Sequence, residues 1–192
     1  MKPINTVIFK LRRCAANALS CLALLTVPAW CQAQANEYEI KAAFLFNFAL
    51  FTQPIAASAP PSAASIESDE AAYRVCIYGK DPFGTALKSL ANRKIARRQI
   101  LLVRGVETDA LKACQLVFFN DPDRDAVRRA LLAVSGLPII TVAELKDFPV
   151  PTVMFNLIMQ DEKVAFQINT VAAKAQQLDV STKLLRLAKN AH

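Results

Sequence analysis

The sequence is poor in histidine and glycine, two residues on which many enzyme sites depend. Its 192 residues contain one histidine, His192 at the very end, and only four glycines. Without an internal histidine, a Ser-His-Asp or Cys-His site lacks its base, and a histidine-containing zinc site lacks its ligands. We therefore expect a protein that is not an enzyme of a familiar type and that holds no metal and no cofactor.

The N-terminus has the three parts of a secretion signal. Four basic residues precede an apolar run at 15–27, and Ala33 and Ala35 provide the small residues that signal peptidase recognises. The apolar run has about 13 residues, whereas a membrane-spanning helix needs ~20. We expect residues 1–35 to be a cleaved signal peptide and residues 36–192 to form one domain outside the cytoplasm.

Loss of the leader would change both the charge and the cysteine content. Four basic residues and no acid would leave, so the formal charge falls from +7 to +3 and argues against nucleic-acid binding. Of five cysteines only Cys76 and Cys114 would remain. One disulfide is the simplest arrangement in an oxidising compartment, with two buried thiols as the alternative. Closing this loop would stabilise the fold by about 4 kcal/mol.

Short apolar strands alternate with helical segments in the middle of the chain. We expect strands at 73–78, 99–103, 115–119 and 137–142, with helices at 82–90, 109–113 and 123–134 between them. This pattern is typical of a largely parallel sheet with helices on both faces. Residues 153–159 and 163–168 flank a short polar turn and should form an antiparallel hairpin at one edge.

The two ends of the mature chain are predicted to be helical. Residues 36–52 form a helix that is apolar on nearly all sides, which indicates burial on more than one face or a surface for self-association or a partner. Residues 53–72 are rich in Pro, Ala and Ser and are expected to be a mobile loop. Residues 170–188 are helical with an interruption near 178–180, and Ser181 should begin a last helix whose Leu184 and Leu187 pack.

Two motifs resemble ligand sites but lack necessary residues. The loop 79–85 has the spacing of a phosphate-binding loop without its lysine, and Pro82 removes a backbone donor. We expect a strand-to-helix turn there, with Asp81 as the N-cap. The alternating acids at 121, 123 and 125 lack the glycine and glutamate of a calcium loop, so they are predicted to cap a helix.

Four basic residues lie close together at 93–98, namely Arg93, Lys94, Arg97 and Arg98. Such runs are usually solvated surface. The functional alternative is a contact with an acidic patch on a partner or with anionic lipid headgroups.

Five segments in order resemble the YfiR family of periplasmic proteins over nearly the whole mature chain. They are EIKAAFLFNFA (Glu39–Ala49), CIYGKDPFGTAL (Cys76–Leu87), CQLVFF (Cys114–Phe119), PIITVAE (Pro138–Glu144) and the C-terminal segment Phe166–Ala188. The chain departs from the family pattern around 92–97 and 149–151, where the family usually has glycines.

The resemblance implies a Rossmann-like α/β fold, a periplasmic location and a homodimer. It also implies a regulator that binds the periplasmic domain of an inner-membrane diguanylate cyclase and holds it inactive, which lowers cyclic-di-GMP signalling. An outer-membrane lipoprotein that sequesters the regulator is a further implied partner. A disulfide between Cys76 and Cys114 fits the family pattern.

The last third of the chain, 166–185, is the expected partner-contact region. The candidate residues are Phe166, Asn169, Leu178, Val180, Ser181 and Leu184, for which ordinary core and capping roles are the alternative. A different class of function is a periplasmic small-ligand-binding protein with its pocket at the strand carboxyl ends, near Gly79 and Asp121. A hydrolase of unfamiliar type is a third hypothesis.

Overall fold

The computed structural model describes residues 30–55, 72–146 and 150–191. Residues Ala35–His192 make up one compact unit. The expected signal peptide lies almost wholly outside the described residues, and so does most of the expected loop 53–72. Within the described ranges, no helix is both long and apolar enough to cross a bilayer.

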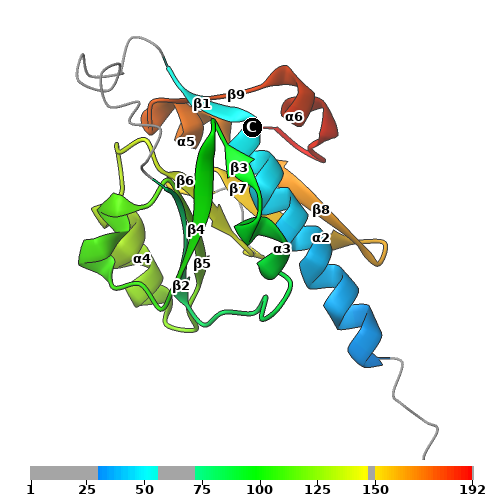
Figure 1. Ribbon diagram of the computed structural model, residues 1–192. Helices are drawn as coiled ribbons and strands as arrows, with labels where there is room; N and C mark the ends of the chain where they lie inside the picture. Colours follow the sequence, from blue (N-terminus) through cyan, green and yellow to red (C-terminus); the bar gives the residue numbers. More distant parts are fainter. Residues whose placement is uncertain (1–29, 56–71, 147–149, 192) are drawn as a thin grey trace, which may run out of the picture. The chain divides into compact units, whose positions relative to one another are not determined.

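A seven-stranded sheet, in the order β3-β4-β2-β5-β6-β7-β8, is the centre of the fold (Figure 1). Five neighbouring strands are parallel: β4 (Arg98–Arg104), β2 (Tyr73–Gly79), β5 (Leu116–Asn120), β6 (Ile140–Ala143) and β7 (Phe155–Gln160). Antiparallel strands β3 (Lys94–Ile95) and β8 (Lys163–Ile168) close the two edges. The predicted largely parallel α/β fold with an antiparallel edge hairpin is thus confirmed.

Helices cover both faces because successive strand residues point to opposite sides. Val75 and Ile77 of β2 belong to the core under α2 (Trp30–Leu50), whereas Cys76 between them belongs to the core under α4 (Arg124–Ala133). In Figure 1, α2 runs along one face and α4 lies on the other. The 3-10 helix η2 (Thr108–Ala113) shares the α4 side, and the short helices α3 (Lys88–Ala91), α5 (Thr170–Ala175) and α6 (Thr182–Leu187) contribute to the α2 side.

Aromatic packing fixes α2 on the sheet. Phe48 is fully buried, and its ring stacks on Phe155 of β7 at a centroid distance of 4.1 Å. Burying one such side chain stabilises the fold by about 1.5–3 kcal/mol. The expected helix 36–52 therefore exists, but it begins at Trp30 and ends at Leu50.

A second, two-stranded sheet was not expected from the sequence. Strand β1 (Thr52–Pro54) pairs antiparallel with β9 (Leu178–Val180). From the sequence, Thr52 is expected in a helix, residues 53–54 are expected in a loop, and 178–180 is expected to be only an interruption between helical segments. Three-residue strands leave no periodic pattern, and these two lie far apart in the chain, so only the tertiary fold reveals the pair.

The expected helix 82–90 is wrong over most of its length. Helical structure begins only at Lys88, and turns precede it. Asp81 does not cap this helix. Its Oδ1 accepts a hydrogen bond from the Phe83 N–H at 2.8 Å, which closes a turn over residues 81–83. Pro82 is compatible with that turn because its fixed φ suits a turn as well as a helix start.

Candidate interaction surface

A buried disulfide ties two neighbouring strands together. Cys76 lies in the middle of β2 and Cys114 two residues before β5, with their Cα atoms 6.1 Å apart and the two sulfurs bonded. Both residues are buried in the core under α4. The bond therefore holds the central pair of parallel strands, β2 and β5, in register from one side. Because it is buried, a reductant reaches it only when the fold opens.

The carboxyl ends of β2 and β5 are where a ligand would bind in a sheet of this order. The chain goes from β2 to β4 on one side and then crosses to β5 on the other side, so the strand order reverses between these two parallel strands. Here the two loops bond directly to each other. The Lys80 N–H donates to the Asn120 carbonyl, and the Asn120 side-chain amide donates to the Lys80 carbonyl, both at 2.8 Å. A Cβ on Gly79 would lie 2.6 Å from the Asn120 carbonyl oxygen. The space next to Gly79 is filled, so the pocket expected near Gly79 and Asp121 has no room at this point.

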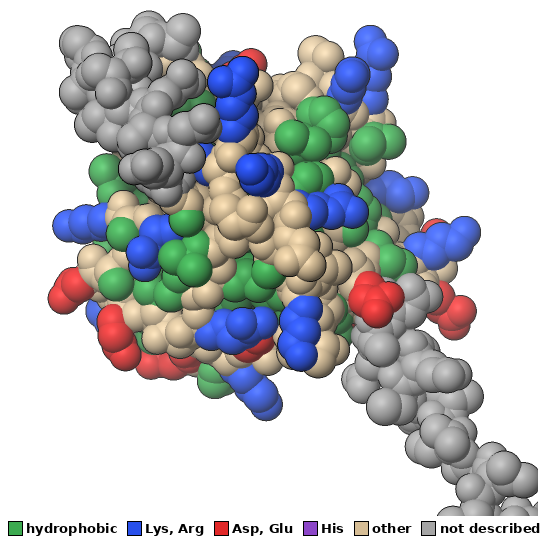
Figure 2. Space-filling view, in the orientation of Figure 1, with side chains coloured by type: hydrophobic (Ala, Val, Ile, Leu, Met, Phe, Trp, Pro, Cys, Tyr) green, Lys and Arg blue, Asp and Glu red, His purple; other side chains and the backbone are tan. Residues whose placement is uncertain are grey.

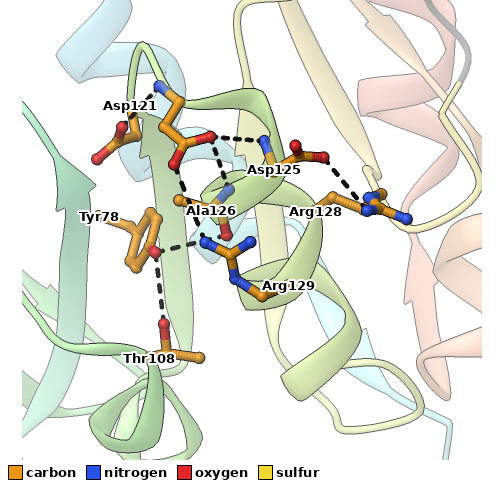
Figure 3. A network of polar contacts seen from close by, with 8 residues as sticks. Tyr78, Thr108, Asp121, Asp125, Ala126, Arg128 and Arg129 are labelled. Carbon is orange, nitrogen blue, oxygen red and sulfur yellow. Dashed lines mark hydrogen bonds and ion pairs between the residues drawn. The ribbon is translucent and has the colours of Figure 1, made fainter.

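The acids after β5 cap α4 and do not form a cation site (Figure 3). Asp121 Oδ1 accepts from the Asp123 N–H, and Asp123 Oδ1 accepts from the N–H groups of Asp125 and Ala126. Arg129 lies 3.9 Å from the other Asp123 oxygen. The predicted capping role is confirmed for Asp123, whereas Asp121 closes the turn before the helix and Asp125 pairs with Arg128. In the described ranges, no three His, Cys, Asp or Glu side chains gather as metal ligands.

Tyr78 connects this network to the loop after β4. Its hydroxyl lies 3.3 Å from Thr108 Oγ1 and 3.5 Å from the Ala126 carbonyl oxygen, so η2 and α4 are joined across the end of β2 (Figure 3). These contacts hold the α4 side of the fold together.

Most of the six predicted partner-contact residues lie in the core. Phe166 of β8 packs against Phe44 and Phe48 of α2, with both centroid distances 5.1 Å. Leu178 and Val180 belong to the same core. A partner could touch these side chains only if the core opened. Their direct contact with a partner stays a prediction, and burial favours the alternative core role.

Two of the six begin helices. Asn169 is the N-cap of α5: its Oδ1 accepts from the Ala172 N–H at 2.9 Å, and its amide donates to the Val150 carbonyl. Ser181 occupies the N-cap position of α6 as expected, but its hydroxyl makes no capping bond and is buried without a partner. Its backbone N–H instead donates to the Phe51 carbonyl, which links α6 to the end of α2.

The sixth residue, Leu184, lines a surface groove between α2 and α6. The groove encloses about 190 Å³ and is lined by Phe44, Asn47, Phe51, Lys183, Leu184 and Leu187. Four of these six side chains are apolar. The groove is therefore suited to an apolar side chain of a partner, with one cation at its rim.

Exposed apolar side chains continue the groove along α2. Leu187 is 70% exposed, Leu50 is 41% exposed and Ile40 is 40% exposed. On a helix, residues three or four apart are neighbours, so Ile40 adjoins Phe44 and Leu50 adjoins Asn47. Figure 2 shows apolar side chains together where α2 and α6 meet. Apolar surface of this kind, bordered by polar residues, is typical of protein interaction sites.

The sequence pointed to only part of this surface. It predicted that Leu187 packs, whereas the last turn of α6 leaves that side chain in solvent. For α2 it left burial and a partner surface open. The structure confirms burial for Leu45 and Phe48 and leaves Leu50 exposed, whereas a partner surface on α2 stays a prediction. The near absence of polar residues on all sides of α2 was the signal for the exposed face.

A comparison with curated protein sequences gives no match. A model of the YfiR/HmsC-like family matches residues 38–189, a span that begins in α2 and ends after α6. This span includes the sheet, the disulfide and the groove. The chain belongs to the YfiR/HmsC-like family.

Proposed function

We propose that the protein is an exported negative regulator of an inner-membrane diguanylate cyclase. It binds the periplasmic domain of the cyclase and keeps it inactive, so that cytoplasmic cyclic-di-GMP stays low. The observation that carries this proposal is the family match over residues 38–189. The buried disulfide between Cys76 and Cys114 agrees with a protein that works in an oxidising compartment.

Repression of this kind depends on a difference between two affinities. The regulator must bind the inactive cyclase more tightly than the active one, because equal binding would shift nothing. Moving the cyclase from 99% active to 99% inactive needs a difference of about 10⁴-fold. A surface with a fixed apolar groove suits this task, because it binds more tightly to the partner conformation that places an apolar side chain in the groove.

The predicted region 166–185 reaches the surface at several points, including the exposed side chain of Val171, and the groove between α2 and α6 is the part of that surface that is both concave and apolar. Leu184 forms its floor, and Leu187 and Lys183 form its rim. We place the cyclase contact in this groove. The buried residues Phe166, Leu178 and Val180 would then act indirectly, by holding α2, β9 and α6 in position.

The test is a pair of matched leucine-to-lysine variants. Leu187→Lys adds a charge at the rim of the groove, and Leu132→Lys adds the same charge on α4, where the side chain is 62% exposed. Both should fold, because neither leucine is buried. We expect Leu187→Lys to lose the cyclase in a membrane pulldown and to raise cellular cyclic-di-GMP to the level of a deletion strain, while Leu132→Lys behaves as the parent.

Two results would contradict different parts of the proposal. If Leu187→Lys retains the cyclase, the contact lies outside the groove. If the parent protein captures no cyclase and its deletion leaves cyclic-di-GMP unchanged, the regulatory function is wrong. The homodimer and the lipoprotein partner remain predictions, which light scattering and the same pulldown would measure.

A further inference from the structure

The hairpin of β3 and β4 carries a cluster of four cations. Arg93, Lys94 and Arg97 are exposed and Arg98 is half-buried. None of the four makes an ion pair with any described residue, whereas other basic residues such as Arg104 and Arg128 do. Their charge is therefore available to a binding partner.

The fold holds two of these four cations in place. The guanidinium of Arg93 lies 4.6 Å from the ring centroid of Phe46 on α2, and that of Arg98 lies 5.1 Å from the ring centroid of Tyr73. Ile95 between them is buried. Stacking on an aromatic ring contributes about 0.5–1 kcal/mol at an exposed site, and it fixes the positions of the Arg93 and Arg98 charges on the surface.

The hairpin lies at the edge of the sheet that is opposite to most of the acids in the described residues. Parallel strands share one amino edge and one carboxyl edge, and Arg98 begins β4 at the amino edge. The loops after β2, β4, β5 and β6 carry acids at the carboxyl edge, namely Asp81, Glu107, Asp109, Asp121, Asp123, Asp125 and Glu144. Figure 2 shows blue side chains over the part of the molecule where β3 and the start of β4 lie.

Apolar surface adjoins the basic hairpin. Phe46, on which Arg93 stacks, is one helical turn before Leu50, whose side chain is 41% exposed. Cations next to an exposed apolar side chain are the combination found where proteins lie on anionic bilayers, because the apolar group enters the headgroup region while the cations meet the phosphates. An acidic protein surface would need matched carboxylates, whereas a bilayer offers anionic charge at any spacing.

We propose that the β3–β4 hairpin docks on the anionic phospholipid headgroups of a bilayer. This inference goes beyond the proposed function and needs no cyclase, so the two can fail separately. Docking would orient the protein with its amino edge toward the membrane. It would also confine the protein to the plane in which an inner-membrane partner lies, which raises its effective concentration.

The test is sedimentation with vesicles of phosphatidylcholine, with and without phosphatidylglycerol. The parent protein should bind only the vesicles that contain phosphatidylglycerol, and binding should weaken as salt is added. Lys94→Gln with Arg97→Gln removes two exposed cations whose side chains make no ion pair or ring contact with the described residues. A cation near an anionic surface contributes ~1 kcal/mol, so the double variant should bind about 30-fold more weakly.

The matched control is Lys80→Gln with Lys163→Gln, which removes the same charge at the carboxyl edge. It should bind within about threefold of the parent, because its cations face away from the bilayer. The proposal is overturned if the parent ignores phosphatidylglycerol, if it binds neutral vesicles equally well, or if both double variants weaken binding alike. The Lys94→Gln/Arg97→Gln variant could also lose regulation although the parent protein binds no vesicles. That result would assign the hairpin to an acidic protein surface and would overturn the proposal. Circular dichroism of both variants verifies that each is folded.

Discussion

Lys41 Nζ lies 2.8 Å from Glu144 Oε2, although 103 residues separate the two in the chain. The ammonium has no solvent exposure, whereas the Glu144 side chain is 39% exposed. Glu37, one turn earlier on α2, lies 2.6 Å from the same nitrogen, and the ring of Tyr38 lies 4.7 Å away. A buried charge therefore joins α2 to the loop that follows β6.

We predict that the two partners of this pair respond differently to mutation. Glu144→Gln leaves the buried ammonium with one carboxylate fewer and should cost about 1–2 kcal/mol in the free energy of unfolding. Lys41→Met removes the buried charge itself and keeps the apolar stem, so it should change stability by less than about 1 kcal/mol. Urea unfolding of both variants measures the difference. A larger loss in Lys41→Met than in Glu144→Gln would contradict this account.

The same pair predicts a loss of stability at high pH. Burial lowers the pKa of Lys41, but hydrogen bonds to Glu144 and Glu37 and the charges of both outweigh it, so its pKa lies above the usual value of 10.5. A group with a raised folded-state pKa contributes fully below its unfolded pKa and loses that contribution as the pH rises. Stability should therefore fall above pH 10.5, and less steeply in Lys41→Met.

Tyr73 contributes in the same direction and needs its own control. Burial raises the pKa of Tyr73 well above its usual range, even though the charge of Arg98 lowers it. Its contribution is likewise present below its ordinary pKa of 10.0 and is lost as the pH rises. The Tyr73→Phe background separates the two groups. If Lys41→Met does not change the alkaline slope in that background, the lysine is not coupled to the carboxylates as described.

The disulfide should account for a large part of the stability. Replacing Cys76 and Cys114 together by alanine removes a bond across a sequence separation of 38 residues. The loss expected from loop entropy is about 4 kcal/mol. Reductant should lower the free energy of unfolding of the parent protein by a similar amount, which is seen as a lower urea midpoint. It should leave the midpoint of the double variant unchanged. A parent protein that is insensitive to reductant in urea would show that the bond contributes little.

Much of this fold was predictable because its strands are short apolar runs with helices between them. The strand around Cys76, the α4 cap at Asp123 and the β7–β8 hairpin follow from local chemistry. What could not be predicted depends on tertiary contact. Thr52 pairs with Val180 only because α2 and α6 bring them together, and no pattern near either residue indicates it.

The candidate site was also predictable from the sequence only in part. The sequence located the region of α6 and its residue Leu184, but it assigned Leu187 to packing and did not identify the groove. Whether a leucine on a short amphipathic helix is buried depends on what lies opposite, which a single sequence does not reveal. The basic hairpin was visible as a charge run, but its stacking on Phe46 and Tyr73 was not.

The turn of the β3–β4 hairpin should be stabilised by glycine. Ala96 and Arg97 have φ values of 47° and 67°, in the left-handed region that costs a residue with a side chain about 1–2 kcal/mol. Ala96→Gly should raise the free energy of unfolding by about 0.5–1 kcal/mol. Ala43→Gly, in the exposed middle of α2, should lower it by about 1 kcal/mol. If the two substitutions shift the urea midpoint in the same direction, the turn is not strained.

The substitution Gly79→Ala tests whether the carboxyl edge of the sheet is closed. The φ of Gly79 is +80°, and an added Cβ would lie 2.6 Å from the Asn120 carbonyl oxygen and 2.8 Å from Asp121 Cα. Gly136 has a similar φ of +76°, but a Cβ there would meet nothing within 4 Å. Gly136→Ala should therefore cost about 1 kcal/mol from backbone strain alone, and Gly79→Ala about 2–4 kcal/mol because overpacking adds to it. Equal losses in urea unfolding would mean that the loops after β2 and β5 can separate. A crevice between the loops could then hold a small ligand, and this result would favour the alternative function of a small-ligand-binding protein.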